Sequence, residues 1–134
     1  MIEGINHTCI AVNDLERSVA FYRDVLGCKI GPELDYGTVV CIPVQAGKDT
    51  LELMKVNDPN AKNMQFPMKP GEEGNIHICF QVDDIDTHAQ KVKDSGAVIT
   101  TDLHEMTLSS GITIRNFYFR DPDGYALQFL KVKS

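Results

Sequence analysis

The chain has 134 residues, enough for one domain with a buried core, and its 43% hydrophobic and 24% charged residues are ordinary for a soluble globular protein. A net charge of −6 and the absence of any cluster of Lys and Arg argue against nucleic acid as a partner. Because the N-terminus resembles no secretory signal and the longest apolar run, VVCIPV at 39–44, is too short to span a bilayer, we expect a cytoplasmic protein that binds no membrane.

The cysteines favour the same setting. The 4 of them form no Cys-x-x-Cys pair, which argues against a zinc ribbon and against a disulfide framework. Cys9, Cys28 and Cys41 lie in or beside apolar runs, where a free Cys usually behaves as a small buried hydrophobe.

The first predicted elements are a strand that begins at His7 and a helix that follows it. Asp14 is a natural N-cap, since its carboxylate can accept hydrogen bonds from the free N–H groups of the first turn. The apolar face of the helix has helical spacing, and Gly27 fits the left-handed position that ends a helix. This face consists of Leu15, Val19, Tyr22 and Leu26. Three extended stretches follow, at about 28–34, 37–46 and 49–56.

The second half of the chain repeats this order. The segment HTCIAVNDL at 7–15 matches HICFQVDDI at 77–85, and Asp84 and Gly96 take the places of the first cap and the first helix end. The matching apolar helix positions are Ile85, Ala89 and Val92. Three further extended stretches are predicted at about 97–104, 111–120 and 125–132, the last two joined by the tight turn RDPDGY.

The repeat predicts an α+β fold made of two tandem βαβββ modules. The modules cover about 1–56 and 74–134, and the segment 57–73, rich in Pro, Gly and polar residues, reads as a linker. Together they form a single domain, 1–134.

Strand alternation decides where the two matching histidines point. His7 and Cys9 share one face of the first strand, and His77 and Cys79 share the equivalent face of the second copy. The bulky apolar residues between them must lie against the helix, so the histidines point to the opposite, concave face of each sheet.

The last strand of each copy supplies a second polar position. Glu52 lies between two leucines in DTLELMKV, and Gln128 lies between Leu127 and Phe129 in GYALQFLKV. A carboxylate flanked by leucines in a strand is costly unless it is paired or bound. One such residue, or one strand histidine, has an ordinary structural explanation. Four at matching positions on one inferred face favour a binding site made of His7, Glu52, His77 and Gln128.

The motifs HTCIAVNDLERSVAFYRDVLG, LEL, HICFQVDDID and DPDGYALQF together resemble the vicinal oxygen chelate superfamily, over essentially the whole chain. This superfamily includes glyoxalase I, bleomycin and fosfomycin resistance proteins, extradiol dioxygenases and methylmalonyl-CoA epimerase, and glyoxalase I-like proteins look most similar. The resemblance implies a cup-shaped half-barrel, a homodimer, and one divalent metal ion held by His7, Glu52, His77 and Gln128.

The implied ligands form a mixed N/O site that suits Ni, Zn, Co, Mn or Fe(II). Gln128 stands where the family often has Glu, and an amide cannot act as a base. Glu52 is then the catalytic residue, moving a proton through a metal-bound enediolate of a small carbonyl or thiohemiacetal substrate, as in a lactoylglutathione lyase. Alternatively, His104 and Glu105, expected in a loop or at a strand end, supply the base.

The substrate is less constrained. Ala11 and Val56 stand where glyoxalase I enzymes typically hold glutathione with Arg and Asn, which disfavours classical glutathione use, although Asn57 is one step away. Lys62 and Lys69 in the linker are candidates for binding the phosphates of a CoA ester.

Other members of the superfamily define the alternatives. A bleomycin resistance-like protein binds a drug among aromatic side chains without metal, but this chain contains no Trp and has residues able to coordinate at all four positions. An epimerase remains open, as does an extradiol-type dioxygenase using His7, His77 and Glu52. A fosfomycin-type transferase is disfavoured by the missing carboxylate at the last position.

Overall fold

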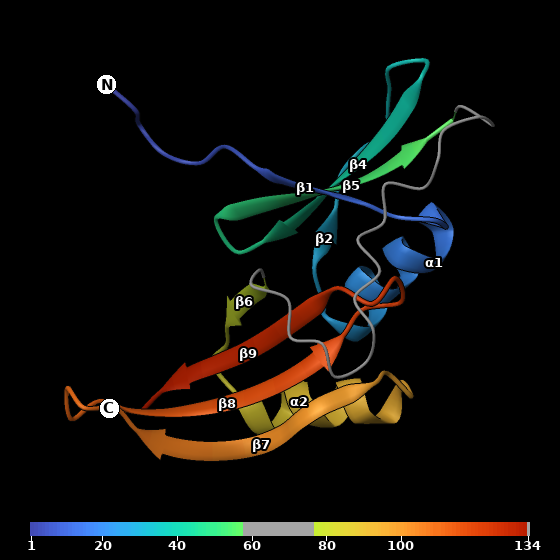
Figure 1. Cartoon of the computed structure of the whole chain (residues 1–134). Helices are drawn as coiled ribbons and strands as arrows, with labels where there is room; N and C mark the ends of the chain where they lie inside the picture. The colour runs from blue at the N-terminus through green and yellow to red at the C-terminus, as the bar shows by residue number, and fades with distance from the viewer. Residues whose placement is uncertain (58–76, 134) are drawn as a thin grey trace. The chain divides into compact units, whose positions relative to one another are not determined.

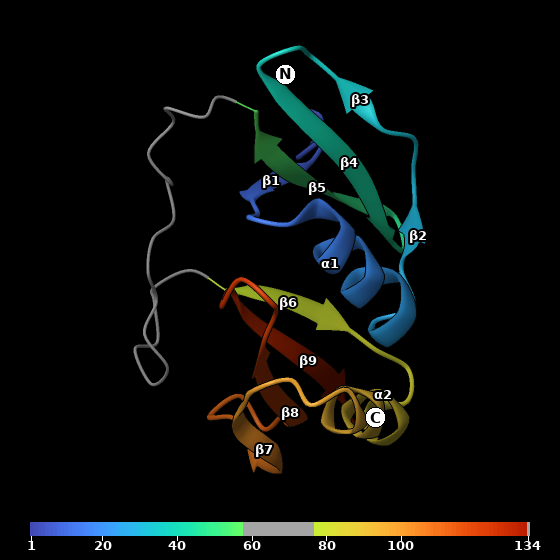
Figure 2. The ribbon, with the colours of Figure 1, turned by 90° about the vertical axis from the view of Figure 1, so that its right-hand side faces the viewer.

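A computed structural model describes residues 1–57 and 77–133 of the chain. The chain divides into two compact units, Met1–Phe66 and Pro67–Ser134. Each unit contains one sheet and one helical segment (Figures 1 and 2), which confirms the α+β class and the paired βαβββ-like modules. The expected half-barrel shape and homodimer stay predictions. The segment 57–73 lies, apart from Asn57, outside the described residues.

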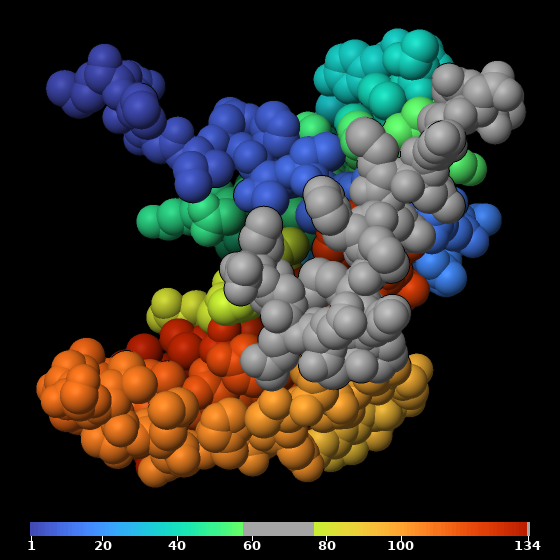
Figure 3. Space-filling view, in the orientation of Figure 1, coloured from blue at the N-terminus to red at the C-terminus, as the bar shows by residue number. Residues whose placement is uncertain are grey.

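The first unit is a mixed sheet with a helix on one face. Its elements are β1 (Thr8–Ala11), α1 (Leu15–Ala20), the π-helical segment η1 (Phe21–Val25), β2 (Lys29–Ile30), β3 (Leu34–Asp35), β4 (Val39–Ala46) and β5 (Asp49–Val56). The strand order is β1-β5-β4-β2, with β3 also on β4. β1 runs parallel to β5, and the other pairs are antiparallel. The chain before β1 extends away from these elements (Figures 1 and 3).

Local signals set the limits of this helical segment. The Asp14 carboxylate accepts a hydrogen bond from the Arg17 N–H at 3.0 Å, and Gly27 ends the segment with φ 75°, so both sequence predictions are confirmed. α1 contacts β4 and β5. Tyr22 of η1 and Leu53 of β5 are fully buried, which places the core of the unit between helix and sheet.

The stretch predicted as one strand over 28–34 is instead two short strands, β2 and β3. Pro32 has no N–H to give to a ladder, so pairing with β4 stops after the Gly31 N–H donates to the Pro43 carbonyl at 2.8 Å. β3 then resumes with Leu34 opposite Cys41, one residue out of step with β2. This part of the prediction was wrong because a proline inside the stretch breaks the ladder.

The second unit repeats the arrangement with longer strands. Its elements are β6 (Ile78–Gln81), α2 (Ile85–Asp94), β7 (Ile99–Thr107), β8 (Thr113–Arg120) and β9 (Ala126–Val132). The order is β6-β9-β8-β7, and again only the first strand runs parallel to its neighbour. α2 contacts β7, β8 and β9 (Figure 1).

An aromatic cluster forms the core of this unit. Phe117, Phe119 and Phe129 are each no more than 2% exposed, and the rings of Phe119 and Phe129 have centroids 4.8 Å apart. The predicted turn between β8 and β9 is confirmed, since the Asp121 carboxylate accepts hydrogen bonds from the N–H groups of Asp123 and Tyr125, both at 2.9 Å. Over the described part of the chain, no helix has the length and apolar character needed to cross a membrane.

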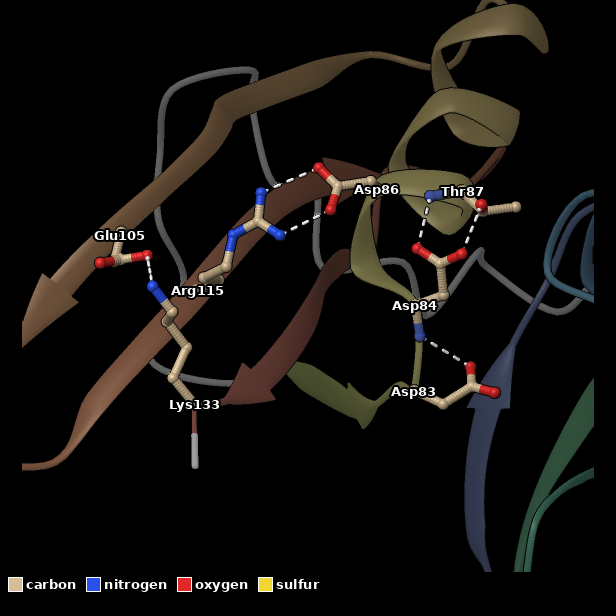
Figure 4. A network of polar contacts seen from close by, with 7 residues as sticks. All are labelled: Asp83, Asp84, Asp86, Thr87, Glu105, Arg115 and Lys133. Carbon is tan, nitrogen blue, oxygen red and sulfur yellow. Dashed lines mark hydrogen bonds and ion pairs between the residues drawn. The ribbon is translucent and has the colours of Figure 1, made fainter.

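The N-terminal end of α2 is tied to the sheet by charged groups (Figure 4). Arg115 of β8 donates two hydrogen bonds to the Asp86 carboxylate, at 2.6 and 2.8 Å. This hydrogen-bonded guanidinium lowers the pKa of Asp86. Asp84 caps α2 by accepting from the Thr87 hydroxyl at 2.7 Å and the Thr87 N–H at 3.2 Å, which lowers its pKa too.

We expect Asp86→Asn to weaken the acid sensitivity of the fold. A carboxyl whose pKa is lowered in the folded state stabilises the protein above its unfolded pKa of about 3.9, and that contribution disappears as the pH falls through the folded value. The urea midpoint of the wild type should therefore fall more steeply below about pH 5 than that of the variant. Asp83→Asn is the matched control, because it removes the same charge from a neighbour that has no arginine partner among the described residues. Equal slopes for Asp86→Asn and the wild type would contradict the assignment.

Candidate functional site

In the first unit, the predicted residues His7 and Glu52 lie together. β1 and β5 pair in parallel with Cys9 opposite Glu52, so His7, two residues before Cys9, lies on the same face of the sheet as Glu52. The His7 Nε2 atom is 3.4 Å from the Glu52 Oε2 atom, and the Nδ1 atom is 2.8 Å from the Asn6 Oδ1 atom. The side chains are 41% and 18% exposed, so both remain open to a ligand.

In the second unit, His77 and Gln128 hold the equivalent positions. Cys79 lies opposite Gln128 in the parallel pair of β6 and β9, so His77 again shares a face with the polar residue of the last strand. The ring of His77 meets Tyr118 edge-on, with centroids 6.3 Å apart. Gln128 is 5% exposed, and its Nε2 donates a hydrogen bond to the Oδ1 atom of Asn116 at 2.7 Å.

The four-residue metal site itself stays a prediction. Among residues 1–57 and 77–133, no three His, Cys, Asp or Glu side chains gather closely enough to hold an ion. That search concerns ligand types other than amides, and each unit contributes one histidine with one oxygen-bearing partner. The chemistry of the donor set suits a divalent ion of the first transition series.

The two cysteines beside the predicted ligands are exposed, as their placement on the histidine face predicts. The expectation that Cys9 is a buried hydrophobe was therefore wrong, because strand alternation turns it away from the helix. Cys41 is buried as expected, and Cys28 is partly buried. Burial raises the pKa of both Cys9 and Cys79, and the negative charge of Glu52 contributes to the rise at Cys9.

His104 and Glu105, the alternative bases, do not lie in a loop. Both belong to β7, which continues to Thr107 and pairs with β8. The His104 Nδ1 atom is 3.1 Å from the Asp102 carbonyl oxygen, and the Glu105 carboxylate binds the Lys133 ammonium at 2.8 Å. A carboxylate already engaged by an ammonium group is a poorer base, which favours Glu52 for this role.

The positions discussed for substrate binding give little cationic character to these faces. Ala11 pairs with Met54 at the end of β1, and Val56 ends β5, on the same face as Glu52. Lys62 and Lys69 lie outside the described residues.

An open hollow elsewhere in the second unit contains none of the predicted ligands. It is lined by Asp83, Asp84, Ile85, Asp86, Arg115, Lys131, Val132 and Lys133. Its Arg115 and Lys133 already bind Asp86 and Glu105, so this region is a surface ion-pair network (Figure 4).

The sequence and fold both match known proteins. Residues 4–129 match the sequence profile of the Glyoxalase/Bleomycin resistance protein/Dioxygenase superfamily. A lactoylglutathione lyase of Haemophilus influenzae is 31% identical over 135 residues, which cover 97% of this chain and 93% of that protein. The chain belongs to this superfamily.

Two further relatives show the range of the superfamily. An ethylmalonyl-CoA/methylmalonyl-CoA epimerase of Cereibacter sphaeroides is 37% identical over 101 residues, covering 72% of this chain and 74% of that protein. A glyoxylase/bleomycin resistance protein/dioxygenase domain from Frankia shares the fold with a TM-score of 0.77 at 21% identity, covering 100% of this chain and 95% of that chain.

Sequence reasoning missed Asn116. A buried Asn in a strand is an observable signal only when its register is known, and the sequence does not show that it lies next to Gln128. The polar letter between Arg115 and Phe117 had no distinguishing pattern.

We expect thiol alkylation to separate the cysteines by position. With iodoacetamide under native conditions, Cys9 and Cys79 should be modified well before Cys41, because the first two are exposed and the third is 4% exposed. Peptide mass spectrometry at several times measures the order. Denaturant is the control, since it should equalise the rates. Early modification of Cys41 would contradict the strand faces assigned to the first sheet.

Proposed function

We propose that this protein is a metal-dependent lyase or isomerase of the glyoxalase I kind, which moves a proton between adjacent carbons of a small carbonyl or thiohemiacetal substrate. The observation that carries the proposal is the His7–Glu52 contact. The carboxylate lies 3.4 Å from an imidazole on an open face, and His7 is its only hydrogen-bond or ion-pair partner within residues 1–57 and 77–133. The lactoylglutathione lyases among the relatives support the reaction class.

His7, Glu52, His77 and Gln128 are the residues that would hold the ion. The fit is supported by the donor chemistry of each unit and by the state of the Gln128 amide. Because its Nε2 is engaged by Asn116, its Oε1 is left as the group able to bind a cation, and no described residue donates to that oxygen. A bound divalent ion would supply a Lewis acid that polarises the substrate carbonyl and acidifies the neighbouring C–H bond.

Glu52 accepts the proton in this proposal and returns it to the neighbouring carbon. Gln128 cannot do so, since an amide is neither a useful acid nor a useful base. The exposure of Glu52 and its single partner among the described residues leave its carboxylate able to shift towards a substrate carbon. The imidazole of His7 orients it.

A CoA-thioester epimerase is the second candidate. It is supported by the 37% identity to the Cereibacter sphaeroides epimerase and by the absence of the typical glutathione-binding residues at Ala11 and Val56. Both candidates require a base beside a C–H bond next to a carbonyl, so Glu52 keeps its role in either.

Metal dependence is the first expected outcome. The purified protein should bind one divalent ion per chain, and His7→Ala and His77→Ala should each abolish this binding while circular dichroism stays unchanged. His104→Ala is the matched control, since that residue is a histidine of β7 outside the proposed ligands. Elemental analysis after dialysis measures it. Retention of a full ion by both ligand variants would disprove the assignment.

Loss of proton transfer in Glu52→Gln is the second. We expect kcat to fall by about 10²- to 10⁴-fold, the usual contribution of a general base. Two assays on the apoprotein, with Ni, Co, Zn, Mn or Fe(II) added singly, separate the candidates. One follows isomerisation of the hemithioacetal of methylglyoxal and glutathione, and the other follows deuterium uptake at the α-carbon of methylmalonyl-CoA in D₂O. Activity in neither assay, or full activity in Glu52→Gln, would overturn the proposal.

A further inference from the structure

The second unit contains one buried pair of amide side chains. Asn116 is 2% exposed and Gln128 is 5% exposed, and they are joined by the 2.7 Å hydrogen bond from Nε2 to Oδ1. In the antiparallel pairing of β8 and β9, Tyr118 lies opposite Gln128, so Asn116 is the diagonal neighbour on the same face.

This hydrogen bond decides which end of the Gln128 amide is available. The end of a glutamine side chain can turn by half a rotation, which exchanges an oxygen that can bind a cation for an NH₂ group that cannot. In the pair present here, the oxygen of Asn116 accepts from the NH₂ group, which leaves the Gln128 Oε1 atom as the free end. An unpaired buried amide would also be costly, so the contact both stabilises and orients the side chain.

The matching place in the first unit holds a different residue. Pro43 lies opposite Glu52 and Cys41 lies opposite Met54, so Cys41 is to Glu52 what Asn116 is to Gln128. The buried thiol of Cys41 makes no hydrogen bond to the carboxylate among the described residues, and burial, with a contribution from the charge of Glu52, raises its pKa. One module therefore fixes its oxygen donor and the other leaves its oxygen donor free to move.

We propose that Asn116 is a positioning residue that holds the Gln128 amide with its oxygen turned outward as a metal ligand. This inference rests on the proposed function, because it needs the ion. It assigns the two modules different tasks: Asn116 and Gln128 provide a fixed ligand, whereas Glu52 provides the movable base.

Metal affinity of Asn116 variants tests the inference. With Co(II) and Zn(II) alone as probes, in competition with a chromophoric chelator, Asn116→Leu should bind about 10- to 100-fold more weakly than the wild type, the usual effect of removing a group that orients a ligand. Asn116→Asp, which keeps the accepting oxygen, should stay within about threefold of the wild type or bind more tightly. Asn116→Ser, whose side chain is one atom too short, replaces the Leu variant if that one does not fold.

Two controls separate positioning from a general structural effect. Phe117→Leu perturbs the same strand on its core face and should lower the melting temperature without changing metal affinity. In a Gln128→Leu background, the Asn116→Leu change should have no further effect on affinity, because the two residues act as one unit. Additive losses in the double variant would overturn the inference.

A measurement without metal gives an independent readout. In the apoprotein, the side-chain NH₂ signals of Gln128 in ¹H–¹⁵N spectra should be shifted and protected from exchange, and Asn116→Leu should remove both properties. If the wild type binds Co(II) or Zn(II) but Asn116→Leu binds equally well, only this inference fails. If the wild type binds neither ion, the proposed function fails first and this role for Asn116 fails with it.

Discussion

The parallel pairing of the first and last strands of each module is the constraint on which the site depends. It sets Cys9 opposite Glu52 and Cys79 opposite Gln128, and so places a histidine beside an oxygen donor in each unit. A slip of one residue would turn Glu52 towards the helix, into the places of Leu51 and Leu53. Because an unpaired carboxylate among apolar side chains is costly, the leucines on either side of Glu52 hold the register that the site needs.

A repeated scaffold does not impose repeated chemistry. Both modules use the same strand order and the same helix cap, yet the residue diagonal to the oxygen donor is Cys41 in one and Asn116 in the other. A thiol is a weak hydrogen-bond donor, whereas an amide forms a strong buried pair. The difference lets one donor be a carboxylate that exchanges protons and the other an amide that only binds.

Features that depend on nearby residues were predictable from the sequence. Capping by Asp14 and Asp84 needs only the first turn of a helix, and the face of each histidine needs only strand alternation. Features that depend on pairing between strands were not. The break at Pro32 and the register shifts between Ile99 and His104 change which residues face each other, so the contact between Asn116 and Gln128 could not be derived from spacing along the chain.

The two faces of each sheet separate stability from chemistry. On the helix side of the second sheet, Phe117, Phe119 and Phe129 form the core, whereas the next residue along each strand reaches the opposite face. A substitution at Gln128 therefore changes the chemistry of the site without opening a cavity among these rings. The same alternation leaves the carboxylate at position 52 free of any packing role. Its retention between two leucines is best explained by the proton it can carry, because packing alone would be better served by an apolar side chain there.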